Sequence, residues 1–251
     1  MLPIQRQKKI KDYLVKNGFA SVDELGKVFN VSGMTIRRDL DELQRQGLIQ
    51  RPYGGAMDTE RAFFEMSFRA KAGQFAEEKE RIGKACADLV QNGDTVFIDS
   101  GTTTYQVARF IKDKIITVVT NSLNIALELA TSPTVDIQVT GGILRKGSLN
   151  VYGPQTEIFL NQIRANKVFI GVEGVDLDSG ITVPDPINAQ NKQSIIKISK
   201  LTYVVADHSK LGRNTASHIA PLEAVDLIIS GKEADPEILK QLSKKVNVKL
   251  V

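Results

Sequence analysis

The sequence predicts a two-part α/β protein, in which a small helical N-terminal unit precedes a larger unit built on a mainly parallel sheet. Three observations lead to this fold class. A length of 251 residues is enough for one or two domains without disulfides or a structural metal. The excess positive charge is confined to the first 56 residues. After residue 76, short apolar runs alternate with segments of helical periodicity.

The composition is that of an ordinary globular chain and excludes several other classes. Charged residues make up 25% and apolar residues 42% of the chain, unlike a disordered or collagen-like protein. No apolar run approaches the roughly 18 residues of a membrane helix, and Arg6, Lys8 and Lys9 interrupt the segment that a signal peptide would keep apolar. A single cysteine, Cys86, can form neither an internal disulfide nor a thiolate metal site. We expect a cytoplasmic protein with no membrane span, metal or cofactor.

Net charge divides the chain into two regions. Residues 1–56 contain ten Lys or Arg and six Asp or Glu, whereas residues 57–251 contain 23 of each. A basic N-terminal segment beside a neutral body favours contact with a polyanion such as double-stranded DNA. On charge alone, the alternative is a set of stray surface lysines with no common role.

Helix caps and apolar spacing predict two helices at the start of the chain. The first covers Pro3–Asn17, because its apolar residues share one face and Asn17 is followed by glycine. The second starts at the capping box Ser21–Glu24, buries Leu25 and Val28, and ends near residue 29.

A third helix follows a tight turn. Ser32 caps it, Ile36, Leu40 and Leu43 form its core face, and Gly47 ends it. Its first turns expose small, polar and basic residues where a helix in a major groove meets base edges and phosphates. The acidic residues 39, 41 and 42 come later and are expected to point away from DNA. The candidate DNA contacts are Ser32, Gly33, Thr35, Arg37 and Arg38.

A short hairpin is predicted after the third helix. Residues 48–51 have the pattern of a strand, and Tyr53-Gly54-Gly55-Ala56 that of its turn toward a partner strand. This small wing carries Arg51 as a further DNA contact. The first 57 residues therefore form a winged helix-turn-helix, and the alternative is a plain three-helix bundle whose arginines only solvate its surface.

Residues 58–76 lack the composition of a flexible linker. They contain Phe63, Phe64, Phe68 and Phe75 among charged residues, and so many aromatic rings are expected to be buried. We interpret the segment as a packed connector between residues 1–57 and residues 77–251. It either relays a signal between the two domains or only packs against one of them.

The remainder of the chain has the pattern of an α/β domain. Its apolar runs lack polar alternation, as in strands buried on both faces of a mainly parallel sheet. The expected strands are residues 96–98, 115–119, 137–139, 168–170, 203–205 and 227–229. The expected helices are residues 80–90, 103–111, 123–130, 155–163 and 189–199, and the first of these buries Cys86 in the core.

Small and polar residues follow the predicted strands, at the edge where α/β proteins bind ligands. The clearest case is Asp99 followed by Ser100, Gly101, Thr102, Thr103 and Thr104, which open a helix. Amides at a helix N-terminus together with hydroxyls can hold a phosphate. The segment is neither a Walker A loop nor a dinucleotide fingerprint. A helix cap without a ligand remains the alternative.

These motifs together resemble a known family. The run Val31–Leu40, followed by Gly47-Leu48-Ile49 and Tyr53–Ala56, closely resembles the DNA-binding signature of the DeoR family of bacterial transcriptional regulators. Asp99–Thr103, Thr120-Asn121-Ser122, Gly171–Asp176 and Asp207–Lys210 resemble the DeoR-type sensor domain, so the match spans nearly the whole chain.

The resemblance implies a fold, an effector and a binding site. The sensor domain would be related in fold to ribose-5-phosphate isomerase, and the effector would be a phosphorylated sugar or its intermediate. Residues 99–104 would hold it. Where the family often has an acidic residue ahead of a lysine, this chain has Asn188 ahead of Lys192. The further implied effector contacts are Asn121, Gly141, Gly142, Lys192 and Lys210.

Three functions are therefore compared. The first is a transcriptional regulator, expected to repress a carbohydrate catabolic operon, that binds its operator as a homodimer or homotetramer on paired half-sites. The second is an isomerase or sugar-phosphate hydrolase, with acid and base groups drawn from Asp99, Glu173, Asp176, Asp185, Lys192 and Asp207. The third is a purely structural DNA-binding protein. We favour the regulator and expect no enzymatic activity and no catalytic residues.

Overall fold

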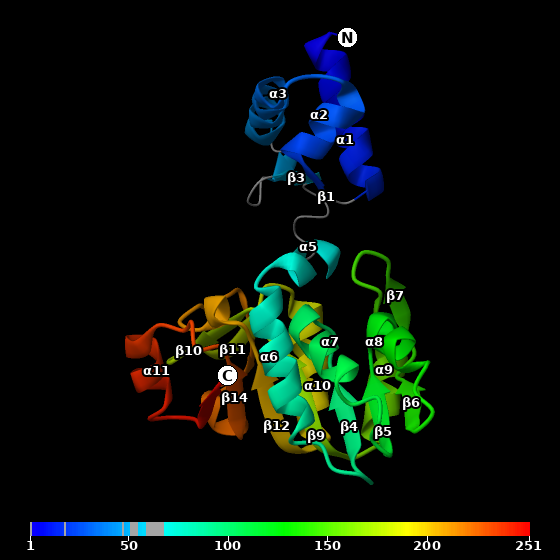
Figure 1. The fold of residues 1–251 in the computed structure, drawn as a ribbon, viewed down its shortest axis with the longest axis vertical. Coiled ribbons are helices and arrows are strands. Elements are labelled where there is room, and N and C mark those ends of the chain that lie inside the picture. The colour runs from blue at the N-terminus through cyan, green and yellow to red at the C-terminus, as the bar shows by residue number, and fades with distance from the viewer. Residues whose placement is uncertain (1, 18, 47, 51–54, 59–67) are drawn as a thin grey trace. The chain divides into compact units, whose positions relative to one another are not determined.

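The structure, a computed structural model, describes residues 2–17, 19–46, 48–50, 55–58 and 68–251. The chain separates into two compact units, residues 1–71 and residues 72–251, and each is described by itself. The C-terminal unit contains the large sheet (Figure 1).

The N-terminal unit combines three helices with a small antiparallel sheet. Its helices are α1 (Pro3–Asn17), α2 (Val22–Phe29) and α3 (Gly33–Arg45), and its strands are β1 (Phe19–Ser21), β2 (Ile49–Gln50) and β3 (Gly55–Asp58). The strand order is β1-β3-β2. The expected three-helix order is thus confirmed, whereas β1 was not predicted.

Side-chain caps start both short helices as the sequence predicts. The Ser21 hydroxyl accepts a hydrogen bond from the Glu24 amide at 3.1 Å, and the Ser32 hydroxyl accepts one from the Thr35 amide at 3.3 Å. Asn30 adopts the left-handed conformation with φ of 51° and ends α2. The tight turn between α2 and α3 follows from these caps.

The core of the N-terminal unit matches the helical spacing with one exception. Ile10, Leu25, Ile36 and Leu40 are fully buried together. Val28 was expected in this core, but 49% of it is exposed, because α2 turns that position toward solvent. The hairpin also differs from the prediction, since Gly55 and Ala56 belong to β3 instead of the turn. Residues 51–54, including Arg51, lie outside the described residues.

A parallel sheet of seven strands organises the C-terminal unit. Its order is β15-β14-β12-β9-β4-β5-β6, and every neighbouring pair is parallel. The strands are β4 (Thr95–Ile98), β5 (Ile116–Thr120), β6 (Val135–Val139), β9 (Ala165–Gly171), β12 (Ser199–Val205), β14 (Leu227–Ser230) and β15 (Val248–Leu250). The predicted parallel sheet is confirmed, and β15 is an addition.

Alternating strand residues build a separate core on each face of this sheet. Val96 and Ile98 pack with α6 (Ala76–Ala87), α7 (Thr102–Arg109) and α8 (Leu123–Leu129). Phe97 points to the other face, which packs with α9 (Pro154–Asn161), α10 (Pro186–Lys197) and α11 (Pro236–Leu242). Cys86 is buried in the first core as expected. Helices therefore cover both faces, as the apolar strands require.

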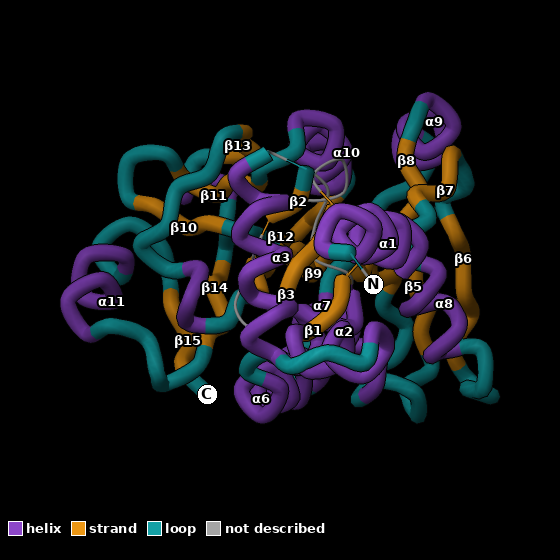
Figure 2. Tube along the Cα trace, turned by 90° about the horizontal axis from the view of Figure 1, so that it is seen from above, coloured by secondary structure: helices purple, strands orange, loops and turns teal. Residues whose placement is uncertain are grey.

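Shorter antiparallel elements complete the C-terminal unit, and none was predicted. One hairpin joins β7 (Ile143–Arg145) to β8 (Asn150–Tyr152), and a three-stranded sheet contains β10 (Gly174–Asp176), β11 (Gly180–Val183) and β13 (Ser217–Ala220). Figure 2 places β7, β8 and α9 on the side of the large sheet that ends with β6, and β10 and β11 on the other side.

The described part of the connector contains α5 (Phe68–Gly73) and leads into α6. Phe75 is only half-buried, with 44% of it exposed, so its expected burial is incomplete. Its ring lies edge-on to the His208 ring at 4.6 Å between centroids. His208 belongs to the short 3₁₀ helix η1 (His208–Lys210) that follows β12. Phe63 and Phe64 lie outside the described residues.

Candidate functional site

The order in which strands are added to the large sheet changes side at β4. From β4 the chain continues to β5 and β6 on one side, and it returns to β9, β12 and β14 on the other. Loops diverge at such a switch point and leave a crevice at the carboxyl ends of the strands. Asp99 is the residue that follows β4 at this point. The predicted strand-end site is therefore at the topological position where α/β proteins bind ligands.

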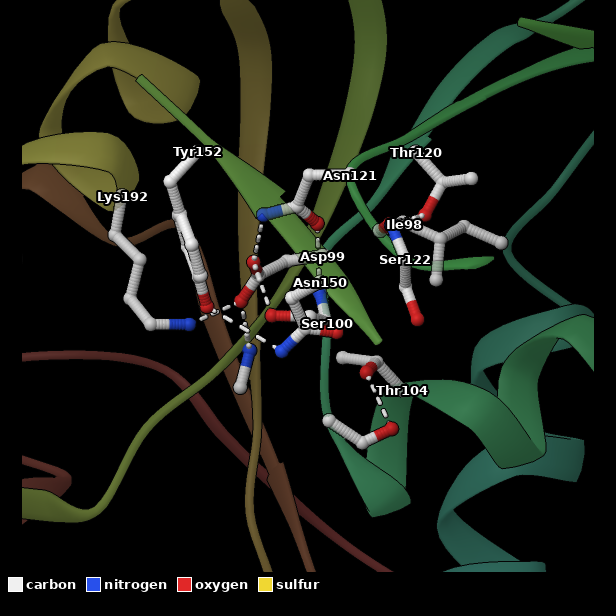
Figure 3. Close-up of polar contacts among 12 residues, drawn as sticks. Ile98, Asp99, Ser100, Thr104, Thr120, Asn121, Ser122, Asn150, Tyr152 and Lys192 are labelled. Carbon is white, nitrogen blue, oxygen red and sulfur yellow. Dashed lines mark hydrogen bonds and ion pairs between the residues drawn. The ribbon is translucent and has the colours of Figure 1, made fainter. Parts of the chain in front are cut away.

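Asp99 is completely buried and collects donors from three different elements (Figure 3). The Lys192 ammonium on α10 forms an ion pair with its carboxylate. The Gly171 amide, at the end of β9, donates to Asp99 Oδ2 at 3.3 Å, and the Asn121 side-chain amide, after β5, donates to Oδ1 at 3.4 Å. Four segments far apart in the sequence thus meet at one carboxylate.

Asn121 also fixes the backbone that leaves β4. Its side-chain oxygen accepts a hydrogen bond from the Ser100 amide at 3.0 Å. The neighbouring Thr120 hydroxyl donates to the Ile98 carbonyl at 2.7 Å. The ends of β4 and β5 are therefore locked together by side chains, and the following turn enters α7 in one defined conformation.

The three threonines that open α7 differ in exposure. Thr102 is half-exposed, whereas Thr103 and Thr104 are buried. The Thr104 hydroxyl donates to the Gly101 carbonyl at 3.0 Å, so its proton is already used within the turn. Thr104 can therefore offer a ligand only its acceptor lone pairs, and the part of all three hydroxyls in binding an effector stays a prediction. The first amides of the helix have no carbonyl one turn earlier to bond with, which is the property an anion requires.

One face of α10 supplies buried polar groups to the crevice side of the sheet. Asn188, Asn191 and Lys192 follow the i, i+3, i+4 spacing and are each at least 95% buried. Among the described residues, both polar atoms of the Asn191 side chain are buried without a hydrogen-bond partner. A buried amide in this state costs roughly 1–3 kcal/mol. The sequence analysis used Lys192 and missed Asn191, although the spacing within α10 could have indicated it.

The β7–β8 hairpin adds two polar residues that the sequence analysis also missed. The Asn150 side-chain amide donates to the Tyr152 hydroxyl at 3.3 Å, and both residues are buried. In Figure 3 the Tyr152 hydroxyl points toward the Lys192 ammonium. Within the described part of the chain, the hydroxyls of Ser122 and Ser148 are buried without a partner near this hairpin.

Two glycines after β6 have a structural explanation. A side chain at Gly142 would place its Cβ 2.6 Å from the Tyr152 carbonyl oxygen, and φ there is 123°. The Thr156 hydroxyl donates to the Gly141 carbonyl at 2.7 Å. These contacts join β6 to the hairpin and to α9. Their role in binding an effector stays a prediction.

Lys210 lies in η1, after β12. Its ammonium pairs with the Glu173 carboxylate at 3.1 Å. The same helix is anchored to α6, because Glu78 accepts hydrogen bonds from the His208 amide at 2.7 Å and from the Gly231 amide at 3.1 Å. The structure therefore brings Lys192, but not Lys210, to Asp99.

In the N-terminal unit, α3 presents the predicted basic residues to solvent. Arg37 and Arg38 are exposed in its first two turns. Ser32 and Thr35 bond to each other through their hydroxyls at 3.0 Å and hold the start of the helix. Gly33 is half-buried, and a Cβ there would lie 3.4 Å from the Val22 side chain. Arg51 is not among the described residues.

The first acidic residue of α3 does not lie on its solvent side. Asp39 is 2% exposed, and its carboxylate accepts hydrogen bonds at 3.2 Å from a guanidinium nitrogen of Arg6 and at 3.2 Å from the Gln7 side-chain amide, both on α1. The Asp39 carboxylate also raises the pKa of Arg6. Asp39 therefore turns away from the exposed start of α3, as expected, and joins α3 to α1. This ion pair spans 33 residues and was not predicted. Asp41, however, is exposed on the same side of the helix as Arg38 and does not lie on the far side as expected.

Comparison with protein families decides what these two units are. Residues 6–61 match the DeoR-like helix-turn-helix domain, and residues 74–232 match the DeoR C-terminal sensor domain. The chain belongs to the DeoR family of transcriptional regulators. It is therefore a DNA-binding regulator with an N-terminal helix-turn-helix and a C-terminal sensor domain for a small molecule.

Full-length relatives support this assignment. The chain is 35% identical over 243 residues to the transcriptional regulator GlpR of Haloferax volcanii, with 96% of this chain and 95% of the relative covered. It is 34% identical over 244 residues to the glycerol-3-phosphate regulon repressor of Escherichia coli K12, with 97% and 96% covered. It is 30% identical over 237 residues to the regulator IolR of Bacillus subtilis, with 94% of each chain covered.

Two solved structures align with this chain at low sequence identity. The full-length sorbitol operon regulator SorC from Klebsiella pneumoniae aligns with a TM-score of 0.42 at 10% identity, and the alignment covers 96% of this chain and 99% of SorC. Ribose 5-phosphate isomerase from Plasmodium falciparum aligns with a TM-score of 0.39 at 14% identity and covers 55% of this chain and 52% of the isomerase. In the described residues, no helix is both long and apolar enough to span a bilayer.

Proposed function

We propose that this DeoR-family regulator represses a carbohydrate catabolic operon and that a phosphorylated sugar, bound at the end of β4, controls its affinity for operator DNA. One observation carries the proposal. A buried ion pair, Asp99 with Lys192, lies at the switch point of the sheet directly before the N-terminus of α7. The Lys192 ammonium and the amides at the N-terminus of α7 are both groups that attract an anion.

The two ends of the ligand would contact different groups. Its phosphate would accept hydrogen bonds from the amides at the start of α7, from Ser100 and from the Lys192 ammonium, which would then share its charge between Asp99 and the phosphate. The sugar hydroxyls would contact the buried amides of Asn121, Asn150 and Asn191. A hydroxyl group can donate to and accept from an amide side chain, so it would satisfy the Asn191 atoms that have no partner among the described residues.

The names of relatives favour this ligand class. One relative controls a glycerol-3-phosphate regulon, and glycerol 3-phosphate is a phosphorylated polyol. We extend the same class of effector to this chain. Gly101–Thr103, Gly141, Gly142 and Lys210 would line the remainder of the crevice, and Thr104 would hold the turn through its bond to Gly101.

DNA binding would use the exposed start of α3. We assign the contacts to Ser32, Gly33, Thr35, Arg37 and Arg38, with Arg51 on the wing. One winged helix covers only a half-site, so the chain would act as a homodimer or homotetramer on paired half-sites. We place this activity in the cytoplasm, together with operator DNA, and expect no catalytic turnover of the effector.

A ligand panel tests the effector class. The melting temperature of the full chain is measured in the presence of triose, pentose and hexose phosphates and of glycerol 3-phosphate. The unphosphorylated compounds and inorganic phosphate are the controls. At one hundred times its dissociation constant, a ligand stabilises the folded state by about 2.7 kcal/mol, which raises the melting temperature of a unit of this size by roughly 5–10 °C. If only unphosphorylated sugars shift the melting temperature, or nothing does, the proposed effector class is wrong.

Paired variants test the site itself. Lys192→Met removes the buried cation, and we expect its affinity for the active sugar phosphate to fall about 10- to 150-fold, because a charge-assisted hydrogen bond contributes roughly 1.5–3 kcal/mol. Lys197→Met is the matched control, since Lys197 is exposed near the end of the same helix. Equal losses in both variants would place the ligand elsewhere.

A further inference from the structure

One large apolar side chain stands exposed on the helix that carries the DNA contacts. Met34 is the second residue of α3, and 72% of it is exposed. The other large apolar residues of this helix, Ile36, Leu40 and Leu43, are buried in the core of the N-terminal unit. Met34 thus takes no part in the packing that gives α3 its buried face.

The helical spacing places Met34 on the outward side of α3. At 100° per residue, Met34, Arg38, Asp41 and Arg45 lie on one side of the helix, opposite to the buried residues. Arg37 and Arg38 are exposed one turn after Met34. Met34 is therefore the first residue on the exposed side of α3, and the next exposed residues along the helix, Arg37 and Arg38, are cations.

We propose that Met34 is a specificity-determining residue that contacts the 5-methyl group of thymine in the major groove. The proposal rests on the DNA-binding role of α3. The N-terminal residues of a recognition helix lie against base edges, whereas flanking arginines bind phosphates. Thymine is the base that presents an apolar group in the major groove.

Charge and shape favour DNA over a protein partner for this side chain. Two exposed arginines beside Met34 match the phosphates that border a major groove. Methionine is unbranched and polarizable, so it can adapt to a methyl group without strain. A protein partner would need an apolar patch, but the neighbouring exposed positions of α3, residues 37, 38, 41 and 45, are all charged.

The first experiment removes only methyl groups from DNA. Preferred duplexes are selected from a random library with the full chain, and each thymine in the selected half-site is then replaced by uracil, which lacks the methyl group and keeps the same hydrogen-bonding atoms. One methyl-sized contact is worth about 0.8 kcal/mol, so we expect about fourfold weaker binding at one or two positions in each half-site.

The second experiment assigns that difference to Met34. The Met34→Ala variant should bind the thymine and uracil duplexes with about equal affinity. Its affinity for the thymine duplex should be close to the affinity of the unchanged protein for the uracil duplex. Alanine favours a helix and Met34 packs in no core, so α3 should stay folded. Arg38→Ala is the control: it should weaken binding to both duplexes and keep their ratio.

The outcomes separate this proposal from the DNA-binding role. If the unchanged chain selects no sequence at all, DNA binding through α3 is itself wrong. If it selects duplexes but tolerates uracil at every position, Met34 does not read thymine. The same conclusion follows if Met34→Ala keeps the preference for the methylated base.

Discussion

In each unit of this regulator a buried ion pair joins segments that are far apart in the sequence, Arg6–Asp39 in one and Lys192–Asp99 in the other, and these two pairs have different surroundings. In the N-terminal unit, Arg6 on α1 meets Asp39 on α3, and Gln7 satisfies a further lone pair of the carboxylate. In the sensor unit, Lys192 on α10 meets Asp99 after β4, close to the N-terminus of α7. The first pair lies between two helices, and the second lies where the ends of β4, β5 and β9 meet α10.

The difference indicates what each pair can do. A charge pair between packed helices fixes their relative rotation, since moving either helix would strand a buried charge. Asp39 directly follows Arg38, so this pair sets which way the exposed arginines point. Asp99 has amide donors besides Lys192, namely Gly171 and Asn121, so its cation can be shared with a ligand at lower cost. The Arg6–Asp39 pair thus fixes the geometry of α3, whereas the Asp99–Lys192 pair is the one that we propose responds to a ligand.

The largest effect is expected when the first pair is broken. Arg6→Met leaves the Asp39 carboxylate buried without its cation, which should cost about 3–5 kcal/mol in the free energy of unfolding of the N-terminal unit. Hydrogen exchange in the full chain should report it as faster exchange in α1 and α3, with the large sheet unchanged. The double variant Arg6→Met, Asp39→Leu should recover much of the loss. Slow exchange in the single variant would show that the pair does not hold α3.

A smaller loss of stability is expected when the second pair is broken. In Lys192→Met, Asp99 keeps the Gly171 and Asn121 donors, so we expect a cost of about 1–3 kcal/mol for the sensor unit. Calorimetric melting of the full chain measures it, and Lys197→Met again serves as the control. If Lys192→Met lowers the free energy of unfolding of the sensor unit as much as Arg6→Met lowers that of the N-terminal unit, the two pairs do not differ in the way described.

The smallest effect concerns Cys86 in the core beneath α6, and it sharpens the comparison with a buried group whose ionisation is governed mainly by desolvation. Burial raises the pKa of the Cys86 thiol, so the fraction of thiolate at pH 8 is lower than in a free cysteine. A disulfide reagent should therefore label Cys86 in the native chain only as fast as the sensor unit unfolds, and a sugar phosphate that stabilises the folded state should slow this labelling slightly. Rapid labelling of the native chain would contradict a closed core at this position.

Regular elements with strong local signals could be predicted from the sequence. Ser21 and Ser32 marked the starts of α2 and α3, because a serine cap acts within one turn. The parallel strands were found because burial on both faces makes them continuously apolar. The antiparallel pairs β7–β8 and β10–β11 were missed, since strands of three or four residues carry almost no periodic signal.

The candidate site was predictable to the extent that it follows strand ends. Asp99 and Asn121 were named from the strand ends, whereas Lys192 was named from the family resemblance, and the structure brings the three residues into contact. Asn150 and Tyr152 were missed because they belong to the hairpin that was not predicted. The Arg6–Asp39 pair joins residues 33 positions apart, and local patterns contain no information about such partners.

The position of Arg6 has a practical consequence for the isolation of the N-terminal unit as a fragment. This side chain stands in the opening turn of α1, the part of a helix that frays most easily. A fragment trimmed to begin at residue 7, or a fusion tag that unwinds the opening turn, would retain every proposed base contact of α3 and still lose the guanidinium that orients them. Loss of operator recognition in such a fragment would then come from the far side of the domain.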